Sequence, residues 1–165
     1  MALLSHTISH SSGTLLLRAK QDVVICRRAV AQIAEELRFS PVGKTMLITA
    51  ASELGRNTVV HGGGGEVAWS VLGAGDQVGV RLVFEDRGPG IADLELAMTD
   101  GWSSHGGLGL GLSGARRLVH EFAIDSNLGK GTRVVVIRWR EFAVTKQSRP
   151  FSPRPKVDDG TFELA

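Results

Sequence analysis

Apolar residues recur with helical spacing in two segments of the first part of the chain. Over residues 21–37 they fall at steps of three and four, which predicts a helix with one narrow apolar face: Val23, Cys26, Val30, Ile33 and Leu37. Ser40 followed by Pro41 predicts the start of a second helix, because serine suits the N-cap and proline suits the first helical position. The glycine run at residues 62–65 is expected to end this second helix.

Alternation of apolar and polar residues predicts strands further along. Residues 77–85 alternate, so that one face carries only apolar side chains: Val78, Val80, Leu82 and Phe84. Residues 66–72 precede a glycine-rich turn, and the two runs together predict an antiparallel hairpin. Further strands are expected at residues 14–17, 123–125 and 133–139, and further helices at residues 93–99 and 112–122.

The order of these segments predicts the fold class. Hairpin connections imply a mixed or antiparallel sheet, and the amphipathic helices need an apolar surface to cover. We therefore expect an α+β fold, a two-layer sandwich with a mixed, largely antiparallel sheet covered on one face by helices. Residues 1–141 would form this domain. Residues 142–165 are rich in proline and charge, and we expect them to be a mobile extension.

Composition excludes several classes of protein. The 165 residues are 42% hydrophobic, which suits one globular domain with a real core. The net charge is only +2 and the basic residues are spread along the chain, so no nucleic-acid footprint is expected. Cys26 stands alone, which excludes disulfides and a thiolate metal site. With no apolar run of membrane-spanning length and no secretory signal, we expect no membrane and a cytoplasmic location.

Three polar residues four apart stand out in the second predicted helix. Glu53, Asn57 and His61 would lie on one side of it, because residues four apart share a face. Their neighbours are mostly apolar, and burying a carboxylate without a partner is costly. We therefore expect a charged ligand, most simply a metal ion, beside Glu53 and Asn57. The alternative is an ordinary solvated helical face.

Asp86 follows the alternating strand and belongs to the motif Asp86-x-Gly88-x-Gly90. The period of two places it on the apolar side, where a carboxylate should meet a specific hydrogen-bond donor. An adenine amino group would serve, and the glycines would let the backbone turn closely under a flat base. The alternative is a common turn in which the aspartate bonds its own backbone.

Glycine is unusually frequent, with 21 residues, and its longest cluster runs from residue 106 to residue 114. This cluster leads into a predicted helix, so its backbone N–H groups could bind phosphates. The alternatives are a flexible loop or a dinucleotide-binding motif at Gly109-x-Gly111-x-x-Gly114. The latter lacks the preceding strand it requires. Thr132, before the last predicted strand, could add a hydroxyl group to the base site.

The motifs occur in one order along the chain, and a fourth completes the set: Glu53-x-x-x-Asn57, Asp86-x-Gly88-x-Gly90, Gly107-x-Gly109-x-Gly111 and Gly131-Thr132. Together they resemble the N, G1, G2 and G3 boxes of the GHKL ATP-binding fold, the superfamily of gyrase, Hsp90, histidine kinases and MutL. The resemblance covers roughly residues 31–139. Without a transducer domain or a phosphoacceptor helix, the chain most resembles the small serine kinases of bacterial partner-switching systems, the anti-sigma group.

Within that group, three stretches are similar to the RsbT-like switch kinases of the stressosome: residues 49–57, 100–107 and 113–122. Arg56 just before the asparagine is the RsbT-like choice, whereas anti-sigma members such as RsbW and SpoIIAB usually have a neutral residue there. The resemblance implies an ATP-dependent serine kinase that phosphorylates a STAS-domain antagonist and binds a PP2C-type phosphatase. The alternative is an anti-sigma factor that binds a sigma factor and phosphorylates its antagonist.

The resemblance also implies a role for each motif residue. Asn57 would hold Mg²⁺ on the phosphates of ATP, and Glu53 would orient the substrate's serine hydroxyl or receive its proton. Asp86 would bond the adenine amino group with support from Thr132. Arg56 would contact the γ-phosphate or the partner. The glycines would shape the base pocket and cradle the phosphates: Gly88, Gly90, Gly107, Gly109 and Gly111.

Overall fold

The computed structural model of the protein describes residues 12–74, 76–100 and 111–141. In chain order they form the following elements: β1 (Ser12–Leu17), α1 (Lys20–Glu36), α2 (Pro41–Val60), β2 (Gly65–Ala74), β3 (Gln77–Asp86), α3 (Leu94–Ala97), α4 (Gly111–Arg117), β4 (Glu121–Asn127) and β5 (Gly131–Trp139). The predicted extension at residues 142–165 lies outside the described residues, and so do Gly107 and Gly109.

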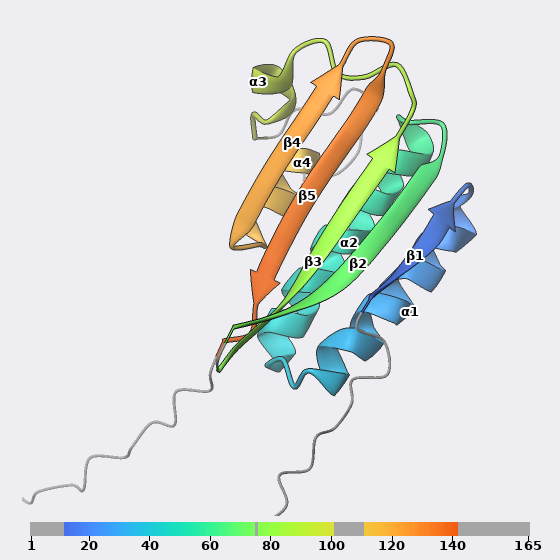
Figure 1. Ribbon diagram of the computed structural model, residues 1–165. Helices are drawn as coiled ribbons and strands as arrows, with labels where there is room; N and C mark the ends of the chain where they lie inside the picture. The colour runs from blue at the N-terminus through green and yellow to red at the C-terminus, as the bar shows by residue number, and fades with distance from the viewer. Residues whose placement is uncertain (1–11, 75, 101–110, 142–165) are drawn as a thin grey trace, which may run out of the picture.

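The strands form one five-stranded sheet in the order β1-β2-β3-β5-β4, and every neighbouring pair is antiparallel. The strand β5 is therefore inserted between β3 and β4 (Figure 1). Phe84 of β3 lies opposite Val67 of β2 and Val134 of β5, and all three are buried. The register thus aligns the inward-facing apolar positions of neighbouring strands, as the alternating pattern of residues 77–85 predicts.

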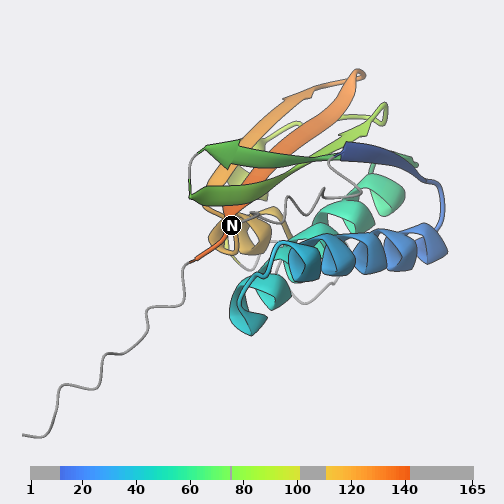
Figure 2. The ribbon, with the colours of Figure 1, turned by 60° about the horizontal axis from the view of Figure 1, so that its bottom comes forward.

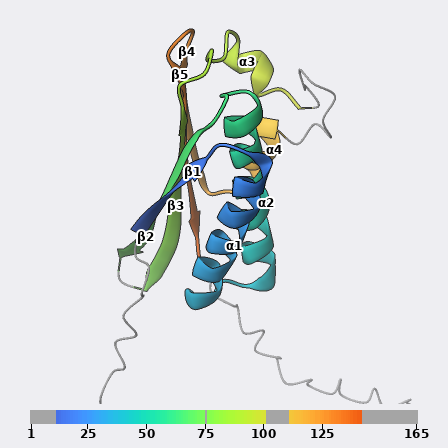
Figure 3. The same cartoon turned by 90° about the vertical axis from the view of Figure 1, so that its right-hand side faces the viewer.

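The helices lie on one face of this sheet. Figure 3 shows the sheet edge-on with α1, α2 and α4 on the same side, and Figure 2 shows α1 and α2 beside each other beneath the strands. Among the described residues, no helix covers the opposite face. The predicted α+β two-layer sandwich is confirmed, and the sheet is antiparallel throughout.

The two long helices begin where the sequence predicts. Ser40 accepts a hydrogen bond from the backbone nitrogen of Gly43 at 3.0 Å, so serine caps α2 and Pro41 opens it. At the start of α1, the carboxylate of Asp22 accepts hydrogen bonds from the backbone nitrogens of Arg18 and Ala19, both at 2.8 Å. These bonds favour the charged carboxylate and lower the pKa of Asp22.

The core lies between the helices and the inner face of the sheet. The inward residues of β3, namely Val80, Leu82 and Phe84, are almost completely buried. Buried side chains of the helices complete it: Cys26, Val30, Ile33, Leu47, Leu54 and Ala115. Cys26 is therefore a packing residue, as expected for a small apolar side chain on the inner face of α1.

The prediction of one helix over residues 112–122 is wrong in its second half. The helix α4 ends at Arg117, and residues 121–127 form β4 instead. Phe122 and Ile124 are half-buried opposite Val136 and Val134, whereas Glu121 is exposed. Phe122 fits both the helical and the strand period, and pairing along the whole of β5 decides in favour of the strand.

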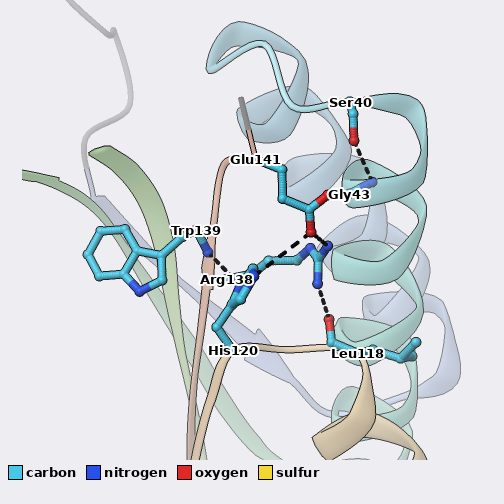
Figure 4. A network of polar contacts seen from close by, with 7 residues as sticks. All are labelled: Ser40, Gly43, Leu118, His120, Arg138, Trp139 and Glu141. Atoms are coloured by element: carbon cyan, nitrogen blue, oxygen red, sulfur yellow. Dashed lines mark hydrogen bonds and ion pairs between the residues drawn. The ribbon is translucent and has the colours of Figure 1, made fainter. Parts of the chain in front are cut away.

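A buried arginine ties the end of α4 to the last strand. Arg138 is only 4% exposed, and it donates to the carbonyl oxygen of Leu118 at 2.8 Å and to Glu141 Oε1 at 2.7 Å. His120 Nδ1 accepts from the backbone nitrogen of Trp139 at 3.0 Å in the same network (Figure 4). These bonds offset the cost of removing the guanidinium group from water and fix the turn between α4 and β4.

In the part of the chain that the structure describes, no helix combines the length and apolar character needed to cross a bilayer.

Candidate functional site

One end of the sheet brings together predicted site residues from three elements. There β3 ends at Asp86, β5 begins at Gly131, and α2 ends close to Gly62 (Figure 1). Asp86 lies directly opposite Thr132 in the antiparallel register. Residues predicted separately, as parts of the second and fourth motifs, are therefore cross-strand neighbours on the helix-covered side of the sheet.

Asp86 lies on the inward side of β3, as the period of two predicts, and it is half-buried. Its Oδ1 atom accepts a hydrogen bond from the backbone nitrogen of Gly88 at 2.9 Å. This is the local turn weighed as the alternative, and it fixes the direction of the carboxylate. A carboxylate has acceptor sites beyond the one that this bond uses, so the turn leaves Asp86 able to bind a ligand as well.

Two glycines allow the close packing around this carboxylate. A Cβ atom at Gly62 would lie 2.3 Å from the Cγ atom of Asp86, so any larger residue would displace the carboxylate. Gly90 has φ of +74°, and a Cβ atom there would lie 2.3 Å from the carbonyl oxygen of Asn127. The loop after β3 is thus held tightly between the end of α2 and the β4–β5 turn.

Ser126 belongs to the same site and was missed at the level of sequence. Its hydroxyl oxygen lies 2.8 Å from Thr132 Oγ1, accepts from the backbone nitrogen of Ile91 at 2.9 Å, and lies 3.2 Å from the carbonyl oxygen of Gly131. The sequence does contain a signal, because Ser126 follows Phe122 and Ile124 on the inward side of β4. Asp86 was identified by the same argument, because it too is a polar residue at an inward-facing position of a strand.

Glu53 and Asn57 lie one turn apart on α2 and are both half-buried. Neither side chain has a hydrogen bond or ion pair with another described residue. The expectation that apolar neighbours would close over this face is wrong, because Arg56 is exposed and Val60 is 46% exposed. Water therefore reaches the carboxylate of Glu53, and the face remains open to a ligand or partner.

A shallow groove of about 210 Å³ runs between α1 and α2 next to Glu53. Its floor is apolar, and its rim carries three exposed cations and one carboxylate. The lining residues are Lys20, Val23, Val24, Arg27, Ser52, Glu53, Arg56, Val59 and Val60. The excess of positive charge on the rim favours an anionic group or an acidic protein surface.

The described residues offer few of the ligands expected for a metal ion held by the protein alone. Within residues 12–74, 76–100 and 111–141, no group of three histidine, cysteine or carboxylate side chains could hold a metal ion. Mg²⁺ in nucleotide sites usually keeps several waters and binds the substrate's phosphates with few protein ligands. The amide of Asn57 has no hydrogen bond to a side chain or backbone group in the described part of the chain, so its oxygen fits an ion carried mainly by a nucleotide.

Of the glycines in the third motif, Gly111 begins α4 with φ of +23°.

Comparison with known proteins agrees with this geometry. Residues 42–141 match the family described as histidine kinase-, DNA gyrase B-, and HSP90-like ATPases. The serine/threonine-protein kinase RsbT of Bacillus subtilis is 39% identical over 118 residues, which cover 72% of this chain and 89% of that protein. The anti-sigma F factor of Clostridium novyi is 28% identical over 125 residues, which cover 73% and 87% of the two chains.

A solved structure supports the fold. The crystal structure of RsbU and RsbW domains from Mycobacterium tuberculosis superposes with a TM-score of 0.52 at 21% identity, covering 78% of this chain. This chain spans about a third of the matched chain, 32%.

Proposed function

Because this chain belongs to the histidine kinase-, DNA gyrase B- and HSP90-like family of ATPases, we propose that it is the switch kinase of a bacterial partner-switching system. It is a serine/threonine-protein kinase of the RsbT type that binds ATP. Its substrate in this proposal is a serine of a STAS-domain protein. A PP2C-type phosphatase is the second partner, bound after the kinase leaves its substrate.

One observation carries this proposal. The helix α2 carries Glu53 and Asn57 one turn apart, neither of them bonded to another residue that the structure describes, and it ends against the carboxylate of Asp86. A base bound at Asp86 and Thr132 would direct its phosphates back along α2 toward Asn57. Glu53, one turn further along the helix, would then lie beside the terminal phosphate.

The nucleotide would be held by the following contacts. Asp86 accepts a hydrogen bond from the adenine amino group, and Thr132 adds a second polar contact. Gly88 and Gly90 keep the loop close under the base. Asn57 would hold Mg²⁺, and this ion would supply charge neutralisation when bound. Three glycines cradle the phosphates: Gly107, Gly109 and Gly111.

Phosphoryl transfer then needs positioning more than covalent chemistry. The serine oxygen of the partner forms a bond to the γ-phosphorus as the bond from that phosphorus to the bridging oxygen breaks, and ADP leaves. Glu53 orients the serine hydroxyl and takes its proton. Arg56 lines the same groove as Glu53 and adds positive charge near the transferred group or the partner.

The groove between α1 and α2 supports a protein substrate. It is open, its rim is cationic, and it includes Glu53, so a partner that docks there would present a side chain to the reacting end of ATP. Since ATP is supplied in the cytoplasm, we place the reaction there.

A second candidate function is favoured by the relative named as an anti-sigma F factor. In this alternative the chain binds a sigma factor and phosphorylates its antagonist. Both functions use the same ATP site and differ in the protein that is held.

The deciding experiment combines transfer and binding. The purified chain is incubated with labelled ATP, Mg²⁺ and candidate STAS-domain proteins, and in parallel with sigma factors in a pull-down. We expect label on a serine of a STAS protein and no stable sigma-factor complex, with Asn57→Ala as the inactive control. A sigma-factor complex would favour the alternative, and absence of both label and nucleotide binding would refute the kinase proposal.

A further inference from the structure

The hydroxyl group of Ser126 connects three segments around the base site. It contacts the backbone nitrogen of Ile91 after β3, and both the carbonyl oxygen of Gly131 and the hydroxyl group of Thr132 at the start of β5. The side chain itself comes from β4, and it lies on the inward side next to Thr132 in the register. A single hydroxyl group therefore links every segment that frames this end of the sheet, apart from α2.

The three contacts can be satisfied together in only one way. A serine hydroxyl has one proton and two acceptor lone pairs. The N–H group of Ile91 must donate, so it occupies one lone pair. If Ser126 donates its proton to the carbonyl oxygen of Gly131, the second lone pair accepts the proton of Thr132. If Ser126 instead donates to Thr132, the contact with Gly131 is left without a proton. The proton positions are assigned from the network, and the first arrangement uses every contact.

This assignment determines what Thr132 offers to a ligand. Its proton is directed to Ser126, so only lone pairs remain toward the site. Asp86, directly opposite Thr132 in the register, is a carboxylate and also offers only acceptors. The wall formed by Asp86 and Thr132 thus presents acceptors alone.

We propose that Ser126 is a positioning residue that fixes Thr132 as a hydrogen-bond acceptor and thereby selects bases with an exocyclic amino group. Such a group carries two N–H donors, which suit two acceptors. A base with an oxo group at the same position would place its oxygen against them, and that is unfavourable. The inference rests on the proposed function, because it takes Asp86 and Thr132 as the base site.

The test compares ATP with inosine triphosphate, which carries an oxo group in place of the amino group. Calorimetry gives the ratio of the affinity for ATP to the affinity for inosine triphosphate, for the wild-type chain and for Ser126→Ala. In the variant the Thr132 hydroxyl is free to rotate and donate, so we expect the ratio to fall about tenfold, the usual size of one hydrogen bond. Ser126→Thr keeps the hydroxyl group and should restore the ratio.

A second variant separates positioning from a merely structural role. Thr132→Val removes the acceptor and leaves the contacts of Ser126 with Ile91 and Gly131 in place. It should lower the ratio by a similar factor, and Ser126→Ala added to Thr132→Val should change it no further. Independent, additive effects, or an unchanged ratio with a lowered melting temperature, would overturn the inference.

The outcomes also distinguish a failure of this inference from a failure of the proposed function. A wild-type chain that binds neither nucleotide would refute the proposed base site and the inference together. A chain that binds ATP with an unchanged ratio in both variants would refute the role of Ser126 alone. If Ser126→Ala does not fold, Thr132→Val still tests whether the acceptor sets the ratio.

Discussion

Replacing Glu53 with glutamine should separate chemistry from nucleotide binding. Glutamine has nearly the same size and helix propensity, so α2 should be unaffected. The carboxylate has no hydrogen bond or ion pair with any described residue, and it is half-buried at the edge of an open groove. No interaction with a described residue is lost, so the free energy of unfolding should change by less than about 0.5 kcal/mol.

The effect on catalysis should be much larger. If Glu53 takes the serine proton, its contribution is made in the transition state, and phosphoryl transfer should fall by about 10²–10⁴-fold. This corresponds to about 2.7–5.4 kcal/mol in the barrier. The affinity for Mg-ATP should stay within about twofold, because the base and the metal are held by Asp86, Thr132 and Asn57.

Single-turnover transfer to the partner's serine, calorimetry with Mg-ATP and thermal unfolding should be measured on one preparation. Glu66→Gln is a matched control, since Glu66 is exposed on the opposite, helix-free face of the sheet. The reasoning is refuted if affinity, melting temperature and transfer fall in proportion, because Glu53 would then only support the helix. Unchanged transfer would exclude it from the reaction.

Three further predictions concern the base, the metal and the core. Asn57→Ala should abolish Mg²⁺-dependent ATP binding without loss of stability, since alanine favours the helix, and unchanged affinity in a calorimetric titration would contradict this. Asp86→Asn should weaken the binding of ATP by about 1.5–3 kcal/mol, while the hydrogen bond from the backbone nitrogen of Gly88 persists. Equal binding of ATP and GTP by the wild-type chain would refute the role of Asp86. Burial raises the pKa of Cys26 to about 12, so at pH 8 its thiol should resist iodoacetamide until urea unfolds the chain, and rapid labelling of the native protein would contradict the structure.

Much of the fold could be predicted from local patterns. The capped start of α2 and the alternation along β3 fixed both elements, and the same alternation placed Asp86 on the inward side. The boundary between α4 and β4 could not be predicted in this way. Phe122 satisfies both periods, and the choice depends on pairing with β5, which lies later in the chain.

For the site, too, some features could be predicted from local patterns and others depend on contacts between distant parts of the chain. The motifs identified Asp86 and Thr132, but only the register makes them neighbours. The burial of Glu53 was overestimated, because the sequence does not show which side of α2 is left open beside α1. Ser126 was missed because the predicted strand covered only residues 123–125, so that the alternation of Phe122, Ile124 and Ser126 along β4 was not recognised.

The position of β5 in the sheet has a consequence for synthesis on the ribosome. The chain emerges from its N-terminus, so α2, β3 and Asp86 are made well before β5. Until β5 emerges, β3 can pair only with β2, and β4 has no strand to pair with among the described elements. Thr132 arrives on this same strand. A nascent chain should therefore be unable to bind ATP until β5 has joined the sheet, and until then the unpaired backbone groups of β3 and β4 would need protection from wrong pairing.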